Sequence, residues 1–77
     1  MDIAEVKRVL AREGVSPARY RILESPDEST WCLKRQASAW VVFYFEGGRR
    51  HEEKLFVDEV EACEHFVKRV TADQGVG

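Results

Sequence analysis

Two cysteines and two histidines are the residues with which this 77-residue sequence could hold a metal or form a covalent intermediate. A structural zinc site usually takes about four Cys or His ligands in paired short spacings. Cys63 and His65 are two positions apart, which turns them to different faces of a helix, while Cys32 and His51 have no such neighbour. We therefore expect no metal and no other cofactor.

Nucleophilic catalysis would require an exposed cysteine activated by a basic neighbour. Cys63 falls on the apolar side of an expected helix, which predicts burial, and His65 and His51 are expected to face solvent. Cys32 and Cys63 are interpreted as small buried side chains in a reducing compartment. Their spacing leaves open whether they meet in space.

Acidic residues occur in adjacent pairs, the pattern from which general acid and base catalysts are sometimes built. Glu52 and Glu53 lie on an expected strand, so they point to opposite faces and do not converge on one substrate. Gly47-Gly48 lacks the following helix and the lysine of a phosphate-binding loop. We interpret the acidic pairs as solvating and helix-capping groups and predict that the chain is not an enzyme.

Two helices are expected at the ends of the chain. The first covers residues 3–13, since Asp2 can cap its start, Gly14 can end it, and apolar residues recur at spacings of three and four. Ser16-Pro17 predicts a further short turn of helix. The second begins after Asp58, and its tail, residues 71–77, is expected to fray. Its predicted apolar face consists of Val60, Cys63, Phe66, Val67 and Val70.

Four strands are expected between the helices, over residues 19–24, 30–35, 39–46 and 49–57. The segment 39–46 is nearly all β-branched or aromatic, with Trp40, Val42 and Tyr44 on one face. Gly47-Gly48 predicts a tight hairpin turn. The highly charged strand after it is typical of a sheet edge.

The resulting order, α-β-β-β-β-α, predicts a single α+β domain over residues 1–77. We expect two layers, an antiparallel sheet of three to four strands packed on one face by the N- and C-terminal helices. Hydrophobic residues make up 44% of the chain and charged residues 34%, which argues against disorder.

The charge balance bears on the class of partner. The formal net charge is −2, without the basic excess that phosphate contacts usually require. Double-stranded RNA-binding domains have a comparable element order, but the start of the second helix, residues 58–61, is acidic and would repel phosphate. No apolar run reaches the length of a membrane span and no signal peptide is visible, so we expect a cytoplasmic protein that binds neither nucleic acid nor membrane.

Protein binding remains, and the charged hairpin with the loop at residues 27–28 is the surface we expect to carry it. Trp40 or Tyr44 would add an aromatic anchor if it lay on an uncovered sheet face. The predicted partner-binding residues are Asp27, Glu28, Tyr44, Glu46, Arg49, Arg50, His51, Glu52 and Glu53.

Residues 40–67 also resemble a group of small, mostly actinobacterial proteins with an aromatic strand, an acidic-glycine-arginine turn and an acidic helix start. The turn, Glu46-Gly47-Gly48-Arg49, departs from the acidic-Arg-Gly order of that group. Tyr20 and Asp27-Glu28 fit upstream. The matching residues are Trp40, Val42, Tyr44, Glu46, Gly48, Arg50, Phe56, Glu59, Glu61, Ala62 and Cys63.

The resemblance implies an immunity protein of a polymorphic or contact-dependent toxin system. Its partner would be a cognate toxin domain, neutralised by occlusion of the active site. The alternative is a small protein-interaction or regulatory module, either monomeric or a weak homodimer paired through the edge strand. A nucleic-acid-binding module ranks third, and catalysis last.

Overall fold

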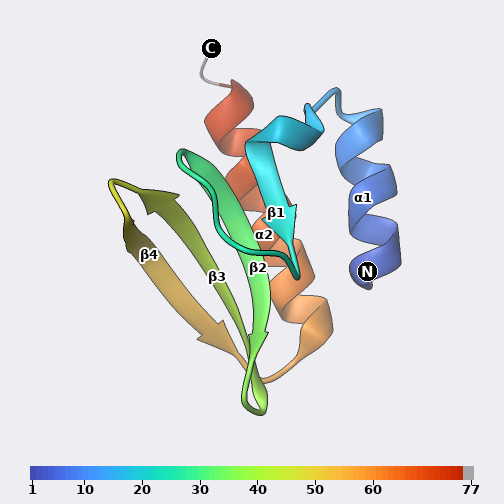
Figure 1. Cartoon of the computed structure of the whole chain (residues 1–77). Coiled ribbons are helices and arrows are strands. Elements are labelled where there is room, and N and C mark those ends of the chain that lie inside the picture. The colour runs from blue at the N-terminus through green and yellow to red at the C-terminus, as the bar shows by residue number, and fades with distance from the viewer. Residues whose placement is uncertain (76–77) are drawn as a thin grey trace.

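The computed structural model describes the backbone of residues 1–75 and the side chains of residues 1–72 (Figure 1). The predicted order of two helices and four strands is confirmed. The elements are α1 (Ile3–Arg12), the short 3-10 helix η1 (Pro17–Arg19), β1 (Tyr20–Ile22), β2 (Thr30–Gln36), β3 (Ala39–Glu46), β4 (Arg49–Phe56) and α2 (Glu59–Gly75).

Helix α1 begins and ends where its capping residues predict. The Asp2 side chain accepts a hydrogen bond from the Glu5 N–H at 2.9 Å. At the other end Gly14 takes a φ of +79°, and the Val15 N–H donates to the Leu10 carbonyl at 2.9 Å. This turn reverses the chain and buries Val15 in the core.

The four strands form one sheet in the order β1-β2-β3-β4. The pairs β2–β3 and β3–β4 are antiparallel as predicted, but β1 runs parallel to β2, with Tyr20 opposite Trp31. The sheet is therefore mixed rather than wholly antiparallel. Because β1 has only three residues, the loop at residues 23–29 is long enough to carry the chain back to the end of the sheet where β1 began.

One face of the sheet, called here the helix-covered face, packs against α2, and α1 packs alongside α2 (Figure 1). Trp40, Val42 and Tyr44 lie on this face, so their predicted common side is confirmed. Val60 is 42% exposed, which corrects its placement on the apolar face of α2, and Ala62 is buried instead. The buried residues of this core are Val6, Leu10, Val15, Tyr20, Ile22, Trp31, Leu33, Trp40, Val42, Ala62, Cys63, Phe66 and Val70.

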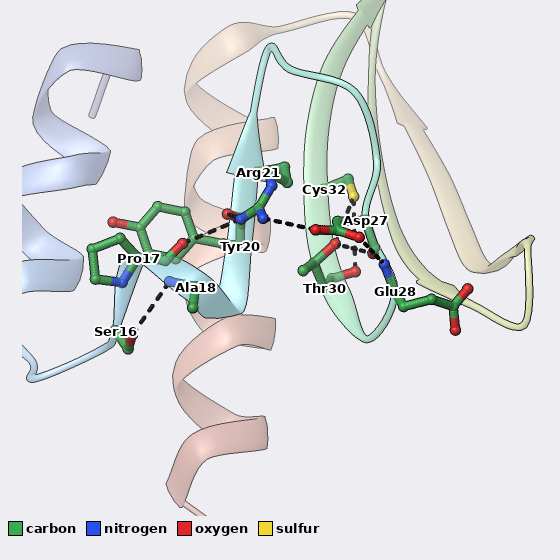
Figure 2. Close-up of polar contacts among 9 residues, drawn as sticks. All are labelled: Ser16, Pro17, Ala18, Tyr20, Arg21, Asp27, Glu28, Thr30 and Cys32. Carbon is green, nitrogen blue, oxygen red and sulfur yellow. Dashed lines mark hydrogen bonds and ion pairs between the residues drawn. The ribbon is translucent and has the colours of Figure 1, made fainter.

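The opposite side of the sheet, called here the open face, has none of the helices of residues 1–75 over it (Figure 1). It nevertheless buries a second apolar cluster of Cys32, Val41 and Phe43, with Phe45 partly buried beside it. The loop at residues 23–29 crosses this face near Cys32, where the Thr30 hydroxyl donates to the Asp27 carbonyl at 2.6 Å (Figures 1 and 2).

The β3–β4 hairpin turns at Gly47 and Gly48, whose φ values of +65° and +72° confirm the predicted tight turn. Strand β4 lies at the sheet edge, as its charges predicted. The register shifts between Val42 and Tyr44, and Glu52 takes a φ of +52°, which marks a β-bulge that the sequence did not predict.

Helix α2 is longer than expected. Its helical backbone continues to Gly75, so residues 71–75 belong to the helix, whereas the sequence assigned them to a fraying tail, and residues 76–77 of that tail lie outside the described residues. The Thr71 hydroxyl donates to the Val67 carbonyl at 2.8 Å and so stays within the helix.

Candidate functional site

The loop at residues 23–29 and the β3–β4 turn meet through Glu28. Its carboxylate accepts hydrogen bonds from the backbone N–H groups of Gly47 and Gly48, each at 2.9 Å. Figure 2 shows the Glu28 side chain extending away from the loop that carries it. Two segments that the sequence assigned to one binding surface are therefore in direct contact.

The electrostatic state of Glu28 follows from this contact. The two glycine N–H groups stabilise the carboxylate and hold the pKa of Glu28 below its usual value of 4.5. The neighbouring Asp27 is bound on its own side of the loop by an ion pair with Arg21 at 3.0 Å and by the Glu28 N–H at 2.9 Å (Figure 2). Both acidic residues therefore hold the loop and the turn in place.

The predicted hairpin residues divide between the two faces of the sheet. Tyr44 pairs with His51, and Glu46 with Arg49, on the helix-covered face. The Tyr44 ring packs on Trp31 with centroids 5.3 Å apart. The condition for an aromatic anchor, a place on an uncovered sheet face, is therefore not met by Tyr44 or by Trp40, which is buried on the same side.

His51 and the two charged residues at the turn remain exposed. His51 Nε2 lies 3.0 Å from the Glu46 carbonyl oxygen, which can only accept, so Nε2 carries the proton here. The Glu46 and Arg49 side chains make no ion pair or hydrogen bond within the described residues. They extend into solvent as one negative and one positive group at the hairpin tip.

Glu52 connects the hairpin to helix α2. Its carboxylate forms an ion pair with Arg69, whose guanidinium lies 5.0 Å from the centre of the Trp31 ring. The bulge at Glu52 lies at the position where β4 makes this contact. Glu52 therefore has a partner within the chain and is less available to another protein than its place in a charged run indicated.

Arg50 and Glu53 belong to the open face. The Arg50 guanidinium lies 4.2 Å from the centre of the Phe43 ring. It donates to Gln36 Oε1 at 3.0 Å and forms an ion pair with Glu53 at 3.3 Å. Arg50, held by Gln36 and Glu53, therefore lies over Phe43 of the second apolar cluster.

The two cysteines are buried, as the sequence predicted. Cys63, carried by α2, lies in the core and Cys32 lies in the cluster on the open face, so both are buried free thiols on opposite sides of the sheet. Burial raises the pKa of the Cys32 thiol and raises the pKa of Cys63 to about 11. Neither thiol is therefore poised to ionise as a nucleophile near neutral pH.

His65 departs from the expectation of a solvent-facing side chain. Its ring packs against Phe56 with centroids 5.1 Å apart, and burial together with nearby cations lowers its pKa. Within the part of the chain that the structure describes, no three Cys, His, Asp or Glu side chains come together as a metal site would require.

Three polar residues that complete this surface were missed by the sequence interpretation: Arg21, Gln36 and Arg69. Each lies outside the charged hairpin in sequence and meets it, or the adjoining loop, only through the fold. For Arg69 a usable signal was its place near the end of a helix expected to pack on the sheet. Gln36 gave no signal, because it follows the strand predicted for residues 30–35 and the structure places it at the end of β2.

Comparisons with models of protein families, with curated protein sequences and with solved structures found no match. Across residues 1–75, neither helix combines the length and apolar character needed to cross a membrane.

Proposed function

We propose that this chain binds another protein through the outer end of the β3–β4 hairpin together with the loop at residues 23–29. The single observation that carries the proposal is the bidentate contact of Glu28 with the Gly47 and Gly48 N–H groups. Glycine allows more backbone conformations than any other residue, and this contact restricts those open to the turn. Fixing it in advance lowers the entropy that is lost when a partner binds.

The fixed turn presents charges that the chain itself does not neutralise. Glu46 and Arg49 lie opposite each other in register, and neither forms an ion pair within the described residues. Unpaired charges of both signs at a rim favour fast association with a complementary surface and disfavour other partners. Buried cysteines with raised pKa values support a binding role over a catalytic one.

The partner we propose is a cognate bacterial toxin domain, neutralised in the cytoplasm by occlusion of its active site. What supports this identity is the resemblance of residues 40–67 to small immunity proteins. Glu46, Gly48 and Arg50, which contribute to the resemblance, lie at the turn or next to it.

The test is co-expression of the chain with the product of the neighbouring open reading frame. We expect a one-to-one complex to elute, and we expect the chain to restore growth of cells that express its partner. If no complex forms and the chain does not protect the cells, the toxin-neutralising function is wrong.

The binding surface is tested by charge reversal. Glu46→Lys removes no internal ion pair, so we expect the fold to persist and partner affinity to fall by about tenfold, in the range of rim charge effects. Glu64→Lys is the matched control, because Glu64 is exposed on α2. Equal affinities of the two variants, measured by calorimetry, would move the interface away from the hairpin.

A second candidate function is self-association as a small interaction module. The observation that favours it is the edge position of β4, which leaves one side of the strand unpaired. The bulge at Glu52 opposes continuous pairing along that side. Light scattering during gel filtration would decide, since a dimer that dissociates when the β4 edge is interrupted would favour this function.

A further inference from the structure

We propose that strand β4 has a second register, in which the residues after the bulge slide by one position along β3. In the observed arrangement, called here the bulged register, Val42 lies opposite Lys54. In the second, called here the slipped register, Val42 lies opposite Glu53 and the extra residue moves from the bulge into the β4–α2 connection. This inference goes beyond the proposed binding function and does not depend on it.

The bulge contains one residue more than a regular strand needs. Glu52 and Glu53 both stand opposite Phe43, where an unbroken register would place a single residue. Glu52 takes a φ of +52°, a conformation that costs free energy for any residue with a side chain. Moving the extra residue out of the strand would release this strain.

The apolar residues after the bulge suit both registers. In the bulged register Phe56 lies opposite Trp40 on the helix-covered face, while Leu55 lies opposite Val41 and is 57% exposed. A slip of one residue turns each later side chain to the other face, so Leu55 would take the place opposite Trp40. Each register therefore turns one large apolar side chain toward the core.

The β4–α2 connection can accept the extra residue. It consists of Val57 and Asp58, and Val57 is 91% exposed, so the core does not hold it in place. The Asp58 side chain accepts from the Val60 N–H and its carbonyl from the Ala62 N–H, each at 3.1 Å. The connection can therefore lengthen before Asp58 while the start of α2 keeps its capping contacts.

The slip would change the charge that faces His65 on α2. The His65 ring packs against Phe56, and the Lys54 ammonium lies 5.6 Å from the centre of the Phe56 ring. In the slipped register Glu53 takes the place of Lys54 on this face. A neighbouring cation disfavours a protonated imidazole and a neighbouring carboxylate favours it, so protonation of His65 would shift β4 toward the slipped register.

The other charges around His65 leave this direction unchanged. The charged groups on β4 and on α2 itself are Lys54, Glu52, Glu61, Glu64, Lys68 and Arg69. Those of α2 keep their places in the slip, as does Arg35 of β2, which lies 5.2 Å from the centre of the Trp40 ring. Burial, then Lys54, lowers the pKa of His65 in the bulged register. Because this register binds the proton more weakly, acid favours the slipped one.

The first test follows exchange between the registers by relaxation-dispersion NMR of the backbone amides. We expect dispersion centred on residues 40–43 and 52–58, growing as the pH falls from about 7.5 to about 5.5. His65→Phe keeps a ring against Phe56 and removes the titration, so its dispersion should not change with pH. No dispersion at residues 52–58 would overturn the second register, and the same pH dependence in His65→Phe would overturn the role of His65.

The strain at the bulge is tested with two substitutions of one residue. Glu52→Gly and Glu52→Ala both remove the ion pair with Arg69, but only glycine adopts the positive φ without strain. We expect Glu52→Gly to hold the bulged register and to show less dispersion than Glu52→Ala. Equal dispersion in the two variants would contradict a slip driven by strain at Glu52.

A matched pair of apolar substitutions tests the two registers directly. Phe56→Ser removes the side chain that the bulged register packs against His65, so the slipped population should rise by about tenfold or more. Cross-strand Overhauser contacts of Trp40 should then go to Leu55. Leu55→Ser should abolish the exchange and leave the fold intact, because Leu55 is exposed in the bulged register. Dispersion that persists in Leu55→Ser would overturn the proposal, even where Phe56→Ser fails to fold.

Discussion

At the scale of single residues, Glu28 shows how one side chain can give a loop and a hairpin a common position. Because the glycine N–H groups lower its pKa, its contribution to stability is fully present above its unfolded pKa, near 4.5. That contribution is lost as the pH falls through the lower pKa of the folded state. Stability therefore rises with pH over this range, as expected for a carboxylate that the folded state stabilises in its charged form.

We expect Glu28→Gln to lower the free energy of unfolding at neutral pH, because the amide NH₂ would replace one acceptor of a glycine N–H. The difference in free energy of unfolding between the variant and the unchanged chain should become smaller in acid, where Glu28 itself becomes protonated. Urea titrations at about pH 7 and about pH 3 measure this difference in free energy. Glu24→Gln, at an exposed position in the same loop, is the control. A difference independent of pH would show that the carboxylate charge is not responsible.

At the scale of elements, the β3–β4 turn requires glycine for its backbone conformation and not because a side chain would clash there. A Cβ added at Gly48 would meet nothing within 4 Å, yet the residue holds a φ of +72°. We expect Gly48→Ala to cost about 1–2 kcal/mol, the price of a left-handed conformation for an ordinary residue. Gly48→Asn should cost less, because Asn tolerates this region. Equal losses in urea titrations would mean that another feature of the turn is being disturbed.

At the scale of the whole molecule, local sequence patterns predicted the helices and strands but did not predict the long-range contacts between them. The β-branched and aromatic run set β3 at residues 39–46, and Asp2 and Gly14 marked the two ends of α1. The parallel direction of β1 was not predicted, because it depends on the path of a loop and not on the sequence of the strand. The bulge was not predicted either, since Glu52 adopts a positive φ without the glycine that usually signals one.

For the candidate site as well, the sequence indicated the segments involved but not all of the contacts between them. Charge and turn residues identified the hairpin and the loop at residues 27–28, and the fold brings them together through Glu28. The division of Arg49 and Arg50 between two faces follows from strand alternation. Strand alternation does not predict which side chains contact the hairpin on each face, because Gln36 and Arg69 come from other elements.

The placement of the two thiols on opposite sides of the sheet gives the protein two internal reporters of its own opening motions. The loop at residues 23–29 crosses the open face near Cys32, whereas Cys63 belongs to α2 and is buried in the core between that helix and the sheet. A loop can lift without the rest of the molecule unfolding, but a helix packed on the core separates only with much larger disruption. We expect a thiol-alkylating reagent to modify Cys32 well before Cys63, with peptide mass spectrometry following each site. Glu28→Gln, which loosens the loop, should accelerate Cys32 more than Cys63. Equal rates at both sites would mean that the domain opens only as a single cooperative unit.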